Sequence, residues 1–386
     1  MTQLRSPQGD PSDRHRIDAA IETALARVKA MLPRFTEQFP APASTNGTYG
    51  AIDNIEWTSG FWTGILWLSY QLSAEEEFRA AALEQVCSFQ HRVDNEIGTD
   101  HHDLGFLYSL SCVAAWKIDG DRSARASALK AADLLRRRYL PVAGIIQAWG
   151  NLNDPAQAGR MIIDCNLNLP LLYWAGDQTG DPAYREVADN HVARAARYLV
   201  RSDDSTFHTF HMDPLTGAPL RGTTHQGYSD TSCWSRGQAW GMYGFPLVYR
   251  YNGASSLIGL SARLSHYFLA RLPADQVCCW DLIFVDGEAE RDTSAAAIAV
   301  CGLLETARQL PLTDANRARF EAAARAILLS LIDNYALGEH DPGDGLLREA
   351  VYHMPEKRGV RERVIWGDYF YLEALMRFTR VWDPYW

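Results

Sequence analysis

The sequence is short of positive charge and of long apolar runs. Its 37 lysines and arginines stand against 47 aspartates and glutamates, which gives a formal net charge of −10. It has no stripe of basic residues interleaved with aromatics, the usual footprint of nucleic-acid binding. The strongest basic cluster, the arginine triplet at 136–138, falls at the end of an expected helix, where cations complement the helix dipole. No apolar stretch reaches membrane-spanning length, so we expect neither nucleic acid nor a membrane as a partner.

The sequence also lacks the common motifs of metal and cofactor chemistry. Its seven cysteines form no CxxC pair, which argues against a zinc ribbon or a redox dithiol. HExxH, the P-loop, GxGxxG and a serine nucleophile elbow are all missing. Histidines at 101–102 and 208–211 could ligate a metal, but histidines that hydrogen-bond hydroxyls or a carboxylate explain them equally well. We therefore expect no metal and no cofactor.

The N-terminal segment offers no targeting signal. Residues 1–16 are polar, contain prolines and lack the apolar core of a signal peptide. Unpaired cysteines within apolar runs suit a reducing compartment. We expect a cytoplasmic protein, a monomer or weak homo-oligomer, with residues 1–14 as a flexible tail.

Helical periodicity runs along nearly the whole chain. Proline and glycine punctuate most of the gaps, as at 180–182 and 341–345. The predicted helices are 15–33, 60–73, 76–93, 103–118, 122–139, 161–176, 183–201, 233–250, 255–271, 292–308, 313–334 and 363–379.

These helices alternate in character. Those at 122–139 and 183–201 are amphipathic and charged, whereas others are nearly charge-free and rich in small and aromatic residues, as in the stretches 60–67, 237–244 and 294–300. A helix that is apolar all round is buried on all sides. The alternation predicts an all-α fold, an (α/α)6 barrel of six inner and six outer helices. Because the inner helices are too irregularly spaced for a solenoid, we expect one barrel domain over residues 1–386.

Two aspartates stand at the starts of apolar runs. Asp103 follows two histidines, and Asp164 is followed closely by two asparagines. An aspartate in such a place is commonly an N-cap, because it accepts backbone N–H bonds. The polar neighbours favour instead a catalytic pair, since two carboxylates across a sugar cleft are the arrangement of retaining and inverting glycosidases. Nearby tryptophan would desolvate one carboxyl and raise its pKa, so that it donates a proton near neutral pH.

Aromatic residues lie at the mouths of the predicted inner helices. The C–H faces of a pyranose stack on indole and phenol rings, while polar groups hold its hydroxyls. Trp57 and Trp149 are flanked by polar residues and glycine and are candidate sugar platforms, together with Trp234 and Trp240. Trp62 and Trp67 lie within a helix, and we expect them in the core. The rim of the barrel is therefore suited to carbohydrate.

Five motifs in a fixed order resemble those of the unsaturated glucuronyl hydrolases, glycoside hydrolase family 88. They are HHDLGF at 101–106, IIDCNLNLP at 162–170, THQGYSD at 224–230, SCWSRGQAW at 232–240 and IWGDYF at 365–370. The match extends from about residue 57 to residue 375, most of the chain. The resemblance independently implies an (α/α)6 barrel.

The resemblance also implies a reaction. That family removes the Δ4,5-unsaturated uronic acid that polysaccharide lyases leave at the non-reducing end of oligosaccharides, from glycosaminoglycans or bacterial polysaccharides. The vinyl ether is hydrated, and the anomeric carbon is not attacked directly. Asp164 would protonate C4 and activate the water that adds at C5, after which the hemiketal opens and the aglycone departs. Asp103 matches the second essential carboxylate, which would hold ring hydroxyls and assist Asp164 as a coupled pair.

Further positions match the family's sugar pocket. The substrate-binding residues implied in this way are Trp57, His102, Trp149, His208, Gln226, Arg236, Trp240 and Tyr352. Arg236 is expected to grip the substrate carboxylate in bidentate fashion. Residues 355–359 stand where members favouring sulfated fragments carry a loop with serine and lysine. Glu356 in this loop would repel a sulfate if it faces the site and would be without effect if it faces solvent, and unsulfated substrates are favoured.

Three other functions stay open on the same residues. An unsaturated rhamnogalacturonyl hydrolase would use similar hydration chemistry on pectin fragments, although the motif at 101–106 favours the glucuronyl branch. A sugar epimerase or isomerase on the same barrel would use histidine bases such as His208 or His211. A non-catalytic sugar-binding barrel would bind ligand with no loss of the C=C absorbance.

Overall fold

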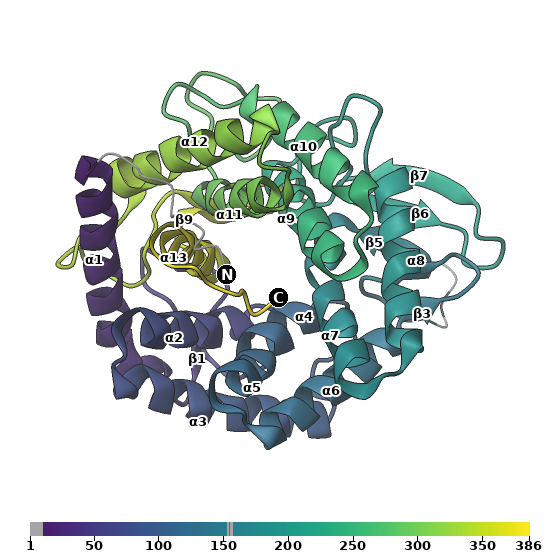
Figure 1. The fold of residues 1–386 in the computed structure, drawn as a ribbon, viewed down its shortest axis with the longest axis horizontal. Coiled ribbons are helices and arrows are strands. Elements are labelled where there is room, and N and C mark those ends of the chain that lie inside the picture. The colour runs from purple at the N-terminus through teal and green to yellow at the C-terminus, as the bar shows by residue number, and fades with distance from the viewer. Residues whose placement is uncertain (1–10, 153, 155–156) are drawn as a thin grey trace.

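The chain folds into two concentric rings of helices, as Figure 1 shows. The computed structural model describes residues 11–152, 154 and 157–386. The inner ring consists of α2 (Ser59–Ser73), α4 (Leu104–Tyr108) continued by the π turn η1 (Ser109–Val113) and α5 (Ala114–Asp119), α7 (Leu169–Thr179), α9 (Ser235–Asn252), α11 (Thr293–Gln309) and α13 (Ile365–Thr379). The outer ring consists of α1 (Pro11–Phe35), α3 (Glu76–Asp94), α6 (Arg122–Arg137), α8 (Pro182–Tyr198), α10 (Ser255–Leu269) and α12 (Ala315–Ser330), which the π turn η3 (Leu331–Tyr335) extends. The predicted (α/α)6 barrel is confirmed.

The two rings differ in burial as the charge pattern predicted. Every residue of α2 from Ser59 to Ser69 is buried. Helix α6 buries only one face, made mainly of alanine and leucine, and is capped by Asp121, whose side chain accepts hydrogen bonds from two backbone N–H groups of the first turn. Trp62 and Trp67 are core residues, as expected, at 1% and 0% exposure.

Glycines bring neighbouring inner helices close together at the ends that carry the candidate site. A Cβ on Gly60 of α2 would lie 2.1 Å from the carbonyl oxygen of Phe106 in α4. A Cβ on Gly105 would lie 2.4 Å from Cα of Asn168, next to the start of α7. Any larger residue would push these helices apart, so the glycines set the spacing of the segments that hold the two aspartates.

Two predicted boundaries are wrong. The helix expected at 161–176 begins instead as strand β5 (Arg160–Ile162) and a 3-10 turn η2 (Ile163–Leu167), and α7 starts only at Leu169, where Pro170 suits a first turn. The expected tail at 1–14 is also too long, because α1 already begins at Pro11; residues 1–10 lie outside the described residues.

Short strands, which the periodicity did not predict, cover the side of the barrel where the inner helices begin. They form four small antiparallel sheets: β1 (Phe39–Pro40) with β2 (Ala51–Ile52), β3 (Tyr139–Leu140) with β4 (Ile145–Ile146), β5 with β6 (Thr209–Met212) and β7 (Pro219–Thr223), and β8 (Ala350–His353) with β9 (Arg358–Glu362). Runs of two to five residues are too short to show alternation. Over the described residues, no helix has both the length and the apolarity needed to span a bilayer.

Candidate active site

The structure brings all ten predicted site residues to one cavity of about 210 Å³. This volume is below the usual range for drug-sized ligands and suits a single small ring. The cavity is lined by Trp57, His102, Asp103, Trp149, Ile162, Asp164, His208, His225, Gln226, Trp234, Arg236, Trp240, Tyr352, His353 and Arg358. The ten predicted site residues did not include Ile162, His225, His353 and Arg358, nor Trp234, which was expected only as an aromatic platform. Ile162, His225 and Trp234 lie within the family motifs of the sequence, and His353 adjoins the predicted Tyr352. Proximity to these positions is the signal that could have found the four residues.

The two aspartates meet at one histidine. Nε2 of His102 lies 3.3 Å from Oδ1 of Asp103 and 3.3 Å from Oδ1 of Asp164. The backbone N–H of His102 donates to Ala148 O at 2.8 Å, which fixes the residue in place. Burial lowers the pKa of His102 to about 4, although the neighbouring Asp103 works in the opposite direction. The imidazole is therefore neutral near neutral pH and lies between two carboxyl groups.

The surroundings divide the two carboxyl groups into an acid and an anion. Burial raises the pKa of Asp164 well above its ordinary value, and the charge of Asp103 raises it further. Burial alone would raise the pKa of Asp103 too, but His102 and His101 outweigh it and lower that pKa. Paired carboxyl groups whose pKa values are pushed apart are the usual arrangement of an acid–base site. Asp164 is thus the group of the pair that retains a proton more readily, and Asp103 the one that ionises more readily.

Neither aspartate serves as an ordinary helix cap. Asp103 precedes α4, but its side chain makes no capping hydrogen bond. Oδ1 of Asp164 is shut off from solvent and has no hydrogen-bond partner in the described part of the chain. A buried carboxyl oxygen without a partner is unfavourable for folding, so the catalytic interpretation is the better one.

Asn168 joins the two segments that carry the aspartates. Its Oδ1 accepts a hydrogen bond of 2.8 Å from the backbone N–H of Phe106. Its Nδ2 donates to the carbonyl oxygen of Asp164 at 3.3 Å. The polar residues that followed Asp164 in the sequence therefore fix the spacing of the pair.

Arg236 lines the cavity but offers no free pair of donors. Its Nη1 donates to Oδ2 of Asp292 at 2.9 Å and to Val351 O at 2.6 Å. Its Nη2 donates to Oε1 of Gln226 at 2.6 Å and to Tyr352 O at 2.7 Å. Four acceptors use all the N–H groups of both Nη atoms. The bidentate grip expected for Arg236 is therefore not what this geometry provides, because the guanidinium is already bonded to the wall of the pocket.

Histidine and amide donors face the cavity instead. Nδ1 of His208 accepts the backbone N–H of His225 at 2.9 Å, so the proton of the neutral ring lies on Nε2. Burial lowers the pKa of His208 well below its ordinary value and keeps the ring neutral. His211 does not line the cavity, and its ring nitrogen contacts Oγ1 of Thr223 at 3.1 Å. The two histidine bases expected for an epimerase are thus not brought together.

Aromatic rings form the floor and walls. Trp57 lies 5.2 Å from Trp366 and 5.8 Å from Phe106, measured between ring centroids, and its Nε1 donates to the hydroxyl of Tyr352 at 3.2 Å. Trp240 packs on Phe106 at 5.3 Å. Trp149, by contrast, is 42% exposed at the mouth. Large rigid rings around polar groups suit the two chemical faces of a sugar.

Two groups of side chains have the composition of a cation site. His102, Asp103 and Asp164 are one group, and His225, His353 and Glu356 are the other, with ligand atoms in each group within 4.8 Å of one another. In the second group Nδ1 of His353 accepts the backbone N–H of Glu356 at 3.2 Å. The ring proton then lies on Nε2, the atom that faces the carboxylate, which is unfavourable for a metal ligand. That the protein needs no metal stays a prediction.

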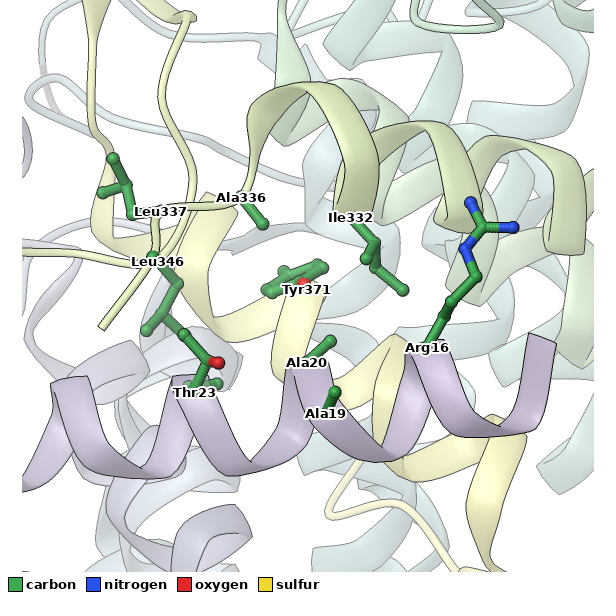
Figure 2. Close-up of a pocket in the computed structure, with 11 residues that line it drawn as sticks. Arg16, Ala19, Ala20, Thr23, Ile332, Ala336, Leu337, Leu346 and Tyr371 are labelled. Carbon is green, nitrogen blue, oxygen red and sulfur yellow. The ribbon is translucent and has the colours of Figure 1, made fainter. Parts of the chain in front are cut away.

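A second cavity, of about 310 Å³, lies between α1, α13 and the segment after α12, as Figure 2 shows. Its lining is mainly alanine and leucine, with Arg16 at one end and Tyr371 projecting from α13. No carboxylate is among its lining residues. The acid–base chemistry therefore belongs to the first cavity.

Comparison with known proteins agrees with this geometry. The model of Glycosyl Hydrolase Family 88 matches residues 28–357. An unsaturated chondroitin disaccharide hydrolase of Streptococcus pyogenes serotype M1 is 49% identical over 96% of this chain and 93% of its own length. An unsaturated glucuronyl hydrolase of Bacillus sp. (strain GL1) is 48% identical over 95% of this chain and 98% of its own.

Solved structures show the same architecture. The crystal structure of the Bacillus sp. GL1 unsaturated glucuronyl hydrolase has a TM-score of 0.92 at 48% identity, covering 94% of this chain and 97% of that one. A structure of the Streptococcus agalactiae enzyme has a TM-score of 0.94 at 48% identity, covering 97% and 94%. A variant of the S. agalactiae enzyme complexed with dGlcA-GalNAc6S has a TM-score of 0.87 at 45% identity, covering 100% and 95%. The chain belongs to glycosyl hydrolase family 88.

Proposed function

We propose that this enzyme is an unsaturated glucuronyl hydrolase, which releases the Δ4,5-unsaturated uronic acid from the non-reducing end of lyase-generated disaccharides and short oligosaccharides. The observation that carries the proposal is Asp164: a buried carboxyl whose pKa is raised well above its ordinary value, beside Asp103, whose pKa is lowered, in a small cavity walled by aromatic rings. Relatives at 48–49% identity that are named for the same activity support it.

The chemistry requires one group that gives a proton and later takes one back. Asp164 donates its proton to C4 of the unsaturated ring, which leaves a positive charge shared by C5 and the ring oxygen. Water then bonds to C5 and returns a proton to the Asp164 carboxylate, so the enzyme ends in its starting state. The C5 hemiketal opens to a ketone, the former ring oxygen remains on C1, and the glycosidic oxygen leaves with the aglycone.

The neighbours of Asp164 assist without reacting. Ionised Asp103 stabilises the positive charge that develops in the ring and accepts hydrogen bonds from its hydroxyls. Neutral His102 lies 3.3 Å from both carboxyl groups and separates them without adding a charge. The tryptophan walls exclude bulk water, so that these charges act in a poorly screened environment.

The substrate carboxylate needs donors other than the Nη atoms of Arg236, which are all in use. The side-chain amide of Gln226 lines the cavity and is held through its oxygen by Arg236, so its NH2 group is free to point inward. Nε2–H of His208 is a second donor. We assign the carboxylate to Gln226 and His208, with Arg236 positioning Gln226.

The rim loop at 355–359 bears on sulfation. Arg358 lies over the ring of Tyr352, with its guanidinium carbon 4.2 Å from the centroid, and Glu356 lies 3.6 Å from Arg358. The Glu356 carboxylate offsets the positive charge of Arg358, the residue of this loop that lines the cavity. This charge balance favours unsulfated chondroitin or hyaluronan disaccharides. A panel of matched sulfated and unsulfated disaccharides tests this. Replacing Glu356 with glutamine should improve turnover of the sulfated members, and an unchanged ratio would count against the assignment.

Loss of the ultraviolet absorbance of the C4=C5 bond tests the function itself. The purified protein should consume unsaturated glucuronyl disaccharides. Activity only on an unsaturated rhamnogalacturonyl disaccharide would favour the pectin-directed alternative, and binding without loss of absorbance would indicate a non-catalytic barrel.

All seven cysteines are free thiols and six are buried, which agrees with a proposed location in the reducing cytoplasm.

A further inference from the structure

Trp149 is the most exposed aromatic residue of the catalytic cavity, and an arginine covers one of its faces. The guanidinium carbon of Arg160 lies 3.6 Å from the centroid of the Trp149 ring. Trp149 is 42% exposed and lines the cavity, whereas Arg160 does not line it. Since a guanidinium at this distance occupies one face of the indole, the opposite face is the one left for a ligand.

Within the part of the chain that the structure describes, no carboxylate pairs with Arg160, and its guanidinium contacts this ring instead. Its Nη1 is shut off from solvent and has no hydrogen-bond partner among the residues that the structure describes. Burial lowers the pKa of Arg160. Two other arginines near the cavity have acidic partners: Arg138 pairs with Asp100, and Arg236 pairs with Asp292. A partly desolvated guanidinium over an indole makes a stronger cation–π contact than a fully exposed one.

The backbone on both sides of this contact is fixed. Arg160 pairs with His211 across β5 and β6. Its carbonyl oxygen accepts the N–H of Ala148 at 2.9 Å, which ties β5 to the residue before Trp149. Nη2 of Arg138 donates to the carbonyl oxygen of Gly150 at 3.0 Å, just after Trp149. With the main chain pinned, the freedom that remains is the rotation of the indole, which Arg160 restricts from one face while the ring of His225 lies 6.2 Å away between centroids.

We propose that Arg160 positions the Trp149 indole as the platform for the sugar that follows the unsaturated ring. This inference rests on the proposed function. The side chains of Asp103 and Asp164 are only 15% and 17% exposed, whereas Trp149 is at the mouth. The unsaturated ring lies against the carboxyl groups, so the leaving sugar lies toward Trp149. Arg160 therefore controls affinity for the leaving sugar and has little influence on proton transfer.

The test replaces Arg160 with methionine, which keeps an unbranched stem and removes the planar cation. KM for an unsaturated disaccharide should rise about threefold to thirtyfold, the range that a partly desolvated cation–π contact represents. The value of kcat should stay within about twofold, because the carboxyl groups are untouched. Arg160→Lys, which keeps the charge without the flat stack, should give a smaller rise in KM.

Arg271 supplies a matched control. Its guanidinium carbon lies 3.6 Å from the ring centroid of Tyr267, the same separation, and neither residue lines the catalytic cavity. Arg271→Met should leave both KM and kcat unchanged. An equal rise in KM for this variant would show that loss of any such stack disturbs the enzyme, and would overturn the proposal.

A double-mutant comparison shows whether Arg160 acts through the ring. In a Trp149→Leu background, Arg160→Met should cause no additional rise in KM, because there is no indole left to position. A full additional rise, or an unchanged KM for Arg160→Met in the wild-type background, would overturn the proposal.

Failure of the proposed function looks different, because the wild-type protein itself would then consume no unsaturated disaccharide. In that case the Kd of the disaccharide for wild type and Arg160→Met, measured by calorimetry, still decides: equal values refute the role of Arg160.

Discussion

Replacing Asp164 with asparagine should remove activity and leave the folded protein at least as stable as the wild type. The amide has the shape of the carboxyl but cannot donate a proton to carbon. We expect kcat to fall by a factor of about 10² to 10⁴, the scale of general acid–base help, which corresponds to about 2.7 to 5.5 kcal/mol of barrier. Stability should not fall in parallel, because Oδ1 of Asp164 has no hydrogen-bond partner to lose among the described residues.

The stability difference between the Asp164→Asn variant and the wild type should change with pH in a defined direction. Burial raises the folded-state pKa of Asp164 above the ordinary value of 3.8, so the native state keeps a proton that the unfolded state has released. Stability of the wild type therefore falls as pH rises from the unfolded pKa through the folded pKa. The asparagine variant lacks this fall, and its Tm relative to wild type should improve as the pH rises above about 4, the ordinary pKa of an aspartate.

Two measurements check this prediction: ultraviolet loss of the C4=C5 bond for kcat, and calorimetry for Tm. Asp281→Asn is a control in which the replaced carboxylate does have hydrogen-bond partners. Asp281 is fully buried and accepts hydrogen bonds from Tyr228 N at 2.9 Å and Ser232 Oγ at 2.7 Å. That variant should lose Tm. A near-normal rate for Asp164→Asn would refute the assigned role, and a Tm loss as large as that of Asp281→Asn would refute the electrostatic argument.

Three further outcomes follow from the same geometry. Turnover should fall on the alkaline side as Asp164 loses its proton and on the acid side as Asp103 gains one; a profile without an alkaline fall in which the protein stays folded would contradict the role of Asp164 as the acid. Asp292→Asn leaves the guanidinium of Arg236 uncompensated in a wall closed to solvent, so denaturant unfolding should show a loss of about 3 to 5 kcal/mol, and a neutral effect would contradict the role of this pair. Gly60→Ala would place a Cβ 2.1 Å from the carbonyl oxygen of Phe106, so Tm should fall by the equivalent of about 1 to 3 kcal/mol, whereas an unchanged Tm would show that α2 and α4 have room to move.

The barrel and its two aspartates could be predicted because both leave a local signal. A charge-free helix such as α2 has to be buried on every side, and its contrast with α6 is visible in the sequence alone. Asp103 and Asp164 stand out because a carboxyl group at the start of an apolar run needs a partner or a use. These signals need no knowledge of residues distant in the chain.

The electrostatics of Arg236 could not be predicted, because its partners are far away in sequence. Val351 O and Tyr352 O, which use two of its N–H groups, are 115 and 116 residues away, and Asp292 is 56 residues away. A motif shows that an arginine is present but not which acceptors it already satisfies. The strands were missed for a related reason: β5, for example, is three residues long and is defined by its pairing with β6, not by its own pattern.

The central claim is that Asp164 delivers a proton to C4 so that solvent attacks C5. The most direct measurement is a brief turnover in water enriched in heavy oxygen, stopped with borohydride before carbonyl exchange, with the label located by mass-spectrometric fragmentation. The account predicts one heavy oxygen on C5 of the released uronate for each turnover and none on the aglycone. Heavy oxygen on C1 with C5 unlabelled would show attack at the anomeric carbon and contradict the claim.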